Sequence, residues 1–182
     1  MGILKTISRD FQQYGINPQR LFASENQNMP KVIANSIPKA GTNLLVRTLY
    51  LSGHLYRRFQ KTLYSNSLED LLKQLRRVQC GEMLPAHLHY DVGYQDILDM
   101  FGFKKLLMVR DPRDIALSNV HYITHKDKSH PLHDYFKNHL KNDNERLLVS
   151  IQGIKSDNIY VPSIAYIFDK YIGSLVSQRF IE

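Results

Sequence analysis

Cysteine is almost absent from this chain, which has 182 residues and a single thiol at Cys80. One cysteine cannot form an internal disulfide, so the disulfide-stapled class of small secreted domains is excluded. The same scarcity fits a reducing compartment, and we expect a cytoplasmic protein. The chain also lacks any stretch near the roughly 20 apolar residues of a membrane helix, and its first residues, MGILKTISRDFQQYG, lack the apolar run of a signal peptide. We therefore expect no membrane span.

Internal repeats and low-complexity blocks are missing as well. Hydrophobic residues make up 43% of the chain and charged residues 23%, which is the composition of a folded protein and not of a disordered tail. A chain of this length fits one domain. We expect a polar lead-in over residues 1–30, punctuated by Pro18 and Pro30, and a single domain over residues 31–182.

Charge of one sign is in excess, with a formal net charge of +7. This balance favours an anionic partner, either nucleic acid, a phospholipid surface or a small polyanion such as a nucleotide, although a merely basic solvated surface explains it too. No helix-turn-helix, zinc or RNP-type signature accompanies the charge. We therefore expect no nucleic-acid partner and place a nucleic-acid-binding domain below a small-molecule nucleotide site.

Apolar periodicity and turn residues predict an α/β fold with a mostly parallel central sheet flanked by helices. Pro85 places one predicted strand at an edge or an end of the sheet, and the four apolar residues Leu106 to Val109 predict a strand buried on both faces. The predicted strands are 31–36, 82–88 and the run ending in Leu106–Val109. The predicted helices are 43–52, the segment that follows Ser67, 93–101, 111–123, 143–153 and 163–177, with a loop at 124–134.

Two predicted strands end in turns that lead directly into a helix: SIPKAGTN at 36–43 and VRDPRD at 109–114. Ligands of parallel sheets lie beyond the carboxyl ends of the strands, so both turns fall on one edge. In the first turn, Gly41 permits close approach of the backbone, and Lys39 adds a charge to the free N–H groups of the helix start. The turn is not a P-loop, because Lys39 precedes the glycine by two positions instead of following a second glycine. ATP hydrolysis is therefore disfavoured.

The second turn places Arg110 at the strand end and Ser118 about two turns into the next helix. Asp114, Ser118 and His121 share one face of this helix, and a second face is apolar and suited to packing on the sheet. Arg110 is placed to bind an anion, although a structural salt bridge to a neighbouring aspartate is an equal alternative.

Together, PKAGTN at 38–43 and RDPRDIALSNVHY at 110–122 resemble the sulfotransferase family. Members transfer a sulfuryl group from 3′-phosphoadenosine 5′-phosphosulfate (PAPS) to a hydroxyl or amine, and the resemblance covers residues 31 to about 176. It implies a P-loop-like sulfotransferase fold with PAPS as donor. It also implies that Arg110 and Ser118 hold the 3′-phosphate. The residues implied to hold the 5′-phosphosulfate are Lys39, Ala40, Gly41, Thr42 and Asn43, of which Ala40 stands where the family usually has serine.

The segment LPAHLHY at 84–90 resembles the strand end that carries the catalytic base of this family. By register the base is His87, and Lys39 stabilises the charge on the leaving bridge. Because His89 takes the family's proline position, His89 remains an alternative base, as does Glu82 if burial raises its pKa. A merely structural, hydrogen-bonded role for His87 is also open. The implied acceptor is a hydroxyl of a carbohydrate or small metabolite.

Four histidines, His121, His125, His130 and His133, raise the question of a metal site, but no nearby cysteine or acidic set completes one and we expect no metal. The chain ends at Glu182, before the strand and the R-K-G-x-x-G segment with which the family supplies a second phosphate-binding arginine. A truncated product, a minimal member and a site completed by a second subunit of a homo-oligomer all remain open. So does a catalytically impaired relative that only binds the nucleotide.

Overall fold

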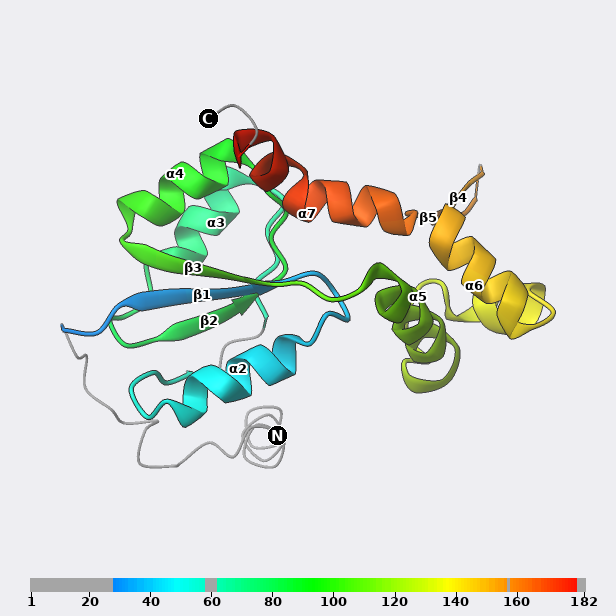
Figure 1. Ribbon diagram of the computed structural model, residues 1–182, viewed down its shortest axis with the longest axis horizontal. Helices are drawn as coiled ribbons and strands as arrows, with labels where there is room; N and C mark the ends of the chain where they lie inside the picture. Colours follow the sequence, from blue (N-terminus) through cyan, green and yellow to red (C-terminus); the bar gives the residue numbers. More distant parts are fainter. Residues whose placement is uncertain (1–27, 58–61, 157, 180–182) are drawn as a thin grey trace. The chain divides into compact units, whose positions relative to one another are not determined.

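The computed structural model describes residues 28–57, 62–156 and 158–179, with the backbone alone over 173–179. Most of the expected lead-in therefore lies outside the described residues. The chain forms two compact units (Figure 1). The first contains the described residues up to Ser36 together with Gly41–Met108, and the second contains Ile37–Ala40 and the described residues from Val109 onward.

The first unit is built on a parallel sheet of three strands in the order β2-β1-β3. The strands are β1 (Lys31–Ser36), β2 (Met83–Ala86) and β3 (Phe103–Met108). The predicted α/β fold with a parallel sheet is confirmed, and β1 matches its predicted bounds. Pro85 lies in β2, an edge strand of this sheet with β1 as its neighbour. The Pro85 carbonyl points away from β1 and accepts the Leu63 N–H at 2.7 Å. The N–H that proline lacks faces that same side, so the β1–β2 ladder loses no bond.

Helices cover both faces of this sheet (Figure 1). They are α2 (Thr42–Leu51) on one face and α3 (Leu68–Leu75) and α4 (Val92–Met100) on the other. The strand period of two divides β1 between two cores: Val32 and Ala34 pack with Val46 of α2, whereas Ile33 packs with the buried leucines of α3. Ser67 caps α3 by accepting the Asp70 N–H at 3.2 Å, as its sequence position predicts.

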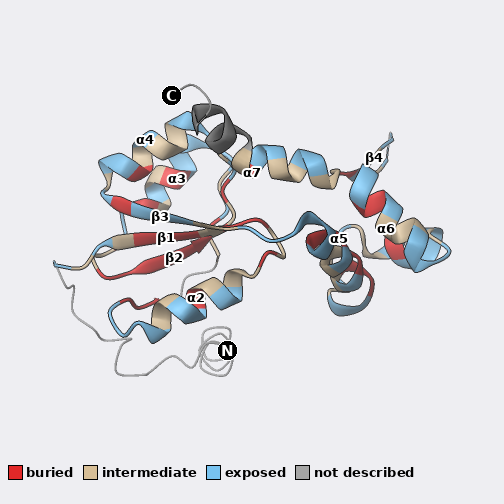
Figure 2. Ribbon diagram, viewed as in Figure 1, coloured by how far each residue is buried: buried red, intermediate tan, exposed pale blue. Residues whose placement is uncertain are grey.

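The prediction that the strand before Arg110 is buried on both faces is wrong. β3 is the strand at the other edge of the sheet, and Figure 2 shows much of it exposed, whereas β1 and β2 are largely buried. Leu106 is 39% exposed and Val109 is 47% exposed. A run of apolar residues is typical of a central strand, but this run lies at an edge that has a single neighbouring strand among the described residues.

The second unit is helical apart from a short hairpin. Its elements are α5 (Pro112–His121), the π-helices η2 (Tyr122–Lys126) and η3 (Tyr135–His139), α6 (Asp143–Gln152), the antiparallel pair β4 (Ile154–Lys155) and β5 (Tyr160–Val161), and α7 (Ile164–Arg179). The three predicted helices of this region are confirmed within a few residues. The expected loop at 124–134 instead begins as a π-helical turn, and η3 and the hairpin were not predicted.

The apolar face of α5 packs inside the second unit. Val120 of α5 lies in one buried cluster with Ile123 of η2, Phe136, Val149 and Val161. The observed partners of this face are therefore η2, η3, α6 and β5, where we expected the sheet. The turn after α6 depends on Gly153, whose φ is 75°. A Cβ there would lie 2.7 Å from the Ser163 nitrogen, so only glycine fits.

The core of the first unit gives a direct test of this packing. Leu71 on α3 is 0% exposed, and Leu68 at the start of the same helix is 45% exposed. We expect Leu71→Ala to lower the free energy of unfolding by about 2–5 kcal/mol, measured by urea denaturation, because it leaves a cavity. Leu68→Ala is the matched control and should cost well under half as much; equal losses would contradict the observed orientation of α3.

Candidate functional site

The turn between β1 and α2 contains two residues with positive φ, and one of them is not a glycine. Lys39 has φ of 69°, the only positive φ outside glycine among the residues that the structure describes, and Gly41 has φ of 114°. Between them, Ala40 is buried and donates its N–H to the Ile37 carbonyl at 3.0 Å. A left-handed lysine costs on the order of 1–2 kcal/mol and typically marks a site where backbone shape matters.

Helix α2 starts immediately after this turn, and neither a capping side chain nor an acidic residue neutralises its start. Gly41 is the N-cap, no side chain caps the helix, and its first turn contains no acidic residue. The N-terminal end of a helix carries a partial positive charge, and its first N–H groups point outward. The first residues, Thr42 and Asn43, therefore lie at an end that favours an anion.

Thr42 connects this helix start to His87 through one buried hydroxyl, all within the first unit. The Ser36 Oγ lies 2.6 Å from the Thr42 Oγ1 and 3.3 Å from the His87 Nδ1. Ser36 is the last residue of β1 and is 0% exposed. His87 directly follows β2, so the carboxyl ends of two neighbouring strands bring these three side chains together.

The segment that carries His87 is fastened to β1. The Asn35 side chain donates to the Leu88 carbonyl at 2.8 Å and accepts the Leu88 N–H at 2.9 Å. The His87 N–H also donates to the Leu63 carbonyl at 2.9 Å. The backbone on both sides of the ring is thus fixed, and the ring itself lies 5.2 Å from the Tyr64 ring, centroid to centroid.

The hydrogen bonds of His87 determine which nitrogen carries the proton. Nδ1 lies 2.7 Å from the Ser36 carbonyl oxygen, and a carbonyl can only accept, so Nδ1 is the donor. In the neutral ring Nε2 is then an unprotonated acceptor. Burial lowers the pKa of His87 below its usual value, and the bond to Ser36 only partly opposes this. At neutral pH His87 is therefore a neutral imidazole with a lone pair on Nε2.

In the second unit, Arg110 lies just before α5 and forms an ion pair with Asp114, Nε to Oδ2, at 3.2 Å. Both side chains are largely exposed, so the pair contributes little to stability and can open. The salt bridge considered from the sequence is therefore present. Asp111 pairs instead with Arg113, at 2.6 Å, and this bonding lowers the pKa of Asp111 to about 2.

The partner of Lys39 could not be identified from the sequence. Its ammonium lies 3.6 Å above the centre of the Tyr122 ring, at the end of α5. Asp114, Ser118 and Tyr122 are spaced by four residues and share one face of the helix, so Ser118 lies between the contacts of Arg110 and Lys39, which are about 12 Å apart along the axis. The signal in the sequence was the place of Tyr122 four residues after Ser118.

The alternative bases lie elsewhere. Glu82 precedes β2, at the opposite end of the strand from His87, and is 0% exposed, with the Gln79 N–H on its Oε2 at 3.1 Å. His89 is exposed. The structure thus brings His87 together with Ser36 and Thr42.

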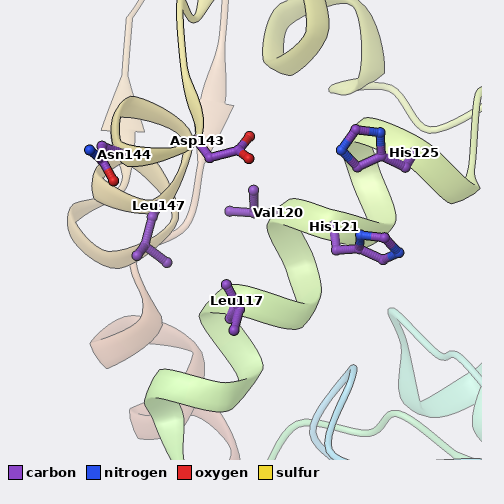
Figure 3. A pocket seen from close by; sticks show the side chains of 7 residues that line it. All are labelled: Leu117, Val120, His121, His125, Asp143, Asn144 and Leu147. Atoms are coloured by element: carbon purple, nitrogen blue, oxygen red, sulfur yellow. The ribbon is translucent and has the colours of Figure 1, made fainter.

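The histidines after Ser118 do not form a metal centre: within the described residues, no three metal-binding side chains lie close enough to hold one ion. His133 bonds the Ile123 carbonyl, and His130 accepts the Leu132 N–H. The other two, His121 and His125, line an open cavity of about 220 Å³ between α5, η2 and the start of α6 (Figure 3). Its remaining lining is Leu117, Val120, Asp143, Asn144 and Leu147.

Comparison with known proteins supports the fold. A solved structure of mouse sulfotransferase SULT7A1 complexed with PAP (3′-phosphoadenosine 5′-phosphate) matches with a TM-score of 0.52 and 16% identity. The fold is sulfotransferase-like. The match covers 89% of this chain and 52% of the mouse protein, so the chain spans about half the length of that relative. No protein-family model and no curated protein matches the sequence. No helix among the described residues is long and apolar enough to cross a membrane.

The environment of His87 predicts a titration that NMR can follow. We expect its pKa to lie below 6.5 and the neutral ring to carry its proton on Nδ1, as seen in long-range ¹H–¹⁵N spectra. Because the folded chain disfavours the charged ring, His87 contributes stability above pH 6.5 that is lost as the pH falls through the folded pKa. His87→Gln assigns the signal. A proton on Nε2 would refute this tautomer, and a pKa above 6.5 would refute the effect of burial on the ring.

Proposed function

We propose that this protein is a PAPS-dependent sulfotransferase that transfers a sulfuryl group to a hydroxyl of a carbohydrate or small metabolite. The observation that carries the proposal is the turn at Lys39, in which a left-handed lysine leads into a helix start without a cap or an acidic residue. Such a turn fits a phosphosulfate, because backbone N–H groups, helix dipole and lysine charge all favour negative charge. The sulfotransferase-like fold and the two sequence motifs support the same proposal. The single cysteine supports a cytoplasmic location.

Each residue of the proposed site has a defined task. Lys39, Ala40, Gly41, Thr42 and Asn43 hold the 5′-phosphosulfate, and Arg110 and Ser118 hold the 3′-phosphate. PAPS supplies the activated sulfuryl group. Lys39 stabilises the negative charge that develops on the bridging oxygen as its bond to sulfur breaks. To bind the 3′-phosphate, Arg110 breaks its exposed ion pair with the Asp114 carboxylate and pairs with the phosphate instead.

His87 acts as the general base in this proposal. As the acceptor oxygen forms its bond to sulfur, its O–H bond breaks and the proton moves to the Nε2 of His87. The hydrogen bond from Nδ1 to the Ser36 carbonyl holds the ring in the tautomer that this step requires. The lowered pKa of His87 keeps the ring neutral, and therefore competent, at neutral pH.

A second candidate is a relative that binds the nucleotide without turnover. Ala40 favours it, because it stands where the family usually has serine, so that a hydroxyl near the transferred sulfate is missing while the residues proposed to hold the nucleotide phosphates are present. A sulfate-transfer assay with PAPS and a panel of sugar and metabolite hydroxyls separates the two: PAP binding with no transfer to any acceptor supports the second candidate.

Calorimetric titration with PAP tests the nucleotide site. We expect Lys39→Ala and Arg110→Ala each to weaken binding by about tenfold to a hundredfold, since each removes a charge-assisted hydrogen bond. Arg113→Ala is the matched control, because Arg113 carries the same charge in the same turn but pairs with Asp111. Its affinity should change less than threefold.

Two results would end the proposal. Wild-type protein that fails to bind PAP would exclude both the enzyme and the binding relative. Equal losses in all three variants would indicate a general effect of charge and not a site. Steeply salt-dependent binding to long duplex DNA that PAP does not displace would revive the nucleic-acid alternative.

A further inference from the structure

Lys39 and Tyr122 are far apart in the sequence, but both belong to the second unit and are in contact there. The lysine nitrogen lies 3.6 Å from the ring centroid, which is well inside the range in which a cation is attracted to an aromatic face. Both side chains are only partly exposed. Water therefore screens the attraction less than it would on an open surface.

The Tyr122 ring is itself fixed from behind. Its hydroxyl donates to the Asp127 Oδ2 at 3.1 Å, and the other oxygen of Asp127 accepts from the Ser129 N–H at 3.1 Å and from the Ser129 hydroxyl at 2.6 Å. The ring also meets the His130 ring edge-on, with centroids 6.4 Å apart. A side chain held at its hydroxyl and its edge presents its face in one direction.

The hydroxyl contact also strengthens the ring's attraction for a cation. A phenol that donates to a carboxylate is polarised, so electron density on the ring increases. This opposes the effect of burial, which lowers the pKa of Lys39 below its usual value. The ring covers only one side of the ammonium group, so N–H donors remain for an anion on the other side.

We infer that Tyr122 is a positioning residue for Lys39: its ring face, fixed by Asp127, attracts the ammonium group and holds it in one place. No ligand is needed for this role. Its consequence for binding rests on the proposed function, in which Lys39 meets the phosphosulfate. Tyr122 would then order the flexible lysine side chain before the nucleotide binds, which lowers the entropy cost of binding.

The decisive test needs no nucleotide. The Lys39 pKa is measured by NMR of ¹³C-labelled lysines in wild type, Tyr122→Phe and Tyr122→Leu, with Lys39→Arg to assign the signal. We expect Tyr122→Phe to lower the Lys39 pKa by about 0.2 units, because it keeps the ring face but loses the hydrogen bond to Asp127. We expect Tyr122→Leu to lower it by about half a unit, because the leucine keeps the burial and removes the ring face. Tyr135→Leu, which removes another partly exposed tyrosine of this unit, should leave it unchanged.

Far-UV circular dichroism checks that each variant is folded, and Tyr122→Met, of similar volume, replaces the leucine variant if that one is not. An unchanged Lys39 pKa in the folded Leu or Met variant would overturn the inference. So would an equal fall in the Phe and Leu variants, because the ring face would then not be responsible.

PAP titration of the same variants adds the link to function. We expect Tyr122→Leu to weaken binding about threefold in the wild-type background and to have no effect in Lys39→Ala, with binding restored by Tyr122→Phe. Equal losses in both backgrounds would show that Tyr122 acts independently of Lys39. If wild type binds no PAP, the proposed function fails, while the Lys39 titration still decides the role of Tyr122.

Discussion

The passage of the chain from β1 into α2 is the constraint on which the candidate site depends. β1 is the central strand of the parallel sheet, and its last residue, Ser36, is completely buried. The chain has only Ile37 to Gly41 in which to leave this strand and begin a helix. It does so through two left-handed residues, and placing a lysine at one of them costs free energy that alanine or serine would cost too and glycine would avoid. A lysine stands there despite this cost, and such strained positions often lie at functional sites.

Most helices and strands could be predicted from the sequence, because the residues that start or end them lie within a few positions of one another. Pro85 acts through the N–H that it lacks, and Ser67 and Asp111 act through side chains that accept a backbone N–H two or three residues later. The structure places Pro85 in an edge strand and the other two at helix starts. The motif around Lys39 belongs to this class, since the turn, the glycine and the helix start lie within a few residues of one another.

The sequence did not show which elements or side chains pack against one another. The run Leu106 to Val109 has the same composition at an edge as at the centre of a sheet, so its exposure depends on which strands flank it. The apolar face of α5 shows that something covers it, but not that η3 and α6 do. The Lys39–Tyr122 contact has the same origin: two residues 83 positions apart carry no joint pattern in a single sequence. The π-helical turns, too, have no periodicity that separates them from a loop.

The hydroxyls near His87 couple its tautomer to the start of α2. With a proton on Nδ1, His87 donates to the Ser36 carbonyl and cannot accept from the Ser36 hydroxyl. The Ser36 hydroxyl must then donate to the Thr42 Oγ1, 2.6 Å away, because a fully buried hydroxyl without an acceptor is costly. The Thr42 hydroxyl hydrogen is then not used in this bond, and an anion bound at the start of α2 could accept it. If the proton were on Nε2, Ser36 could turn to the histidine, and Thr42 would donate to Ser36 instead of to a ligand. In the proposed function, the tautomer that would let His87 act as a base is therefore the same one that would leave the Thr42 hydroxyl free to donate to an anion.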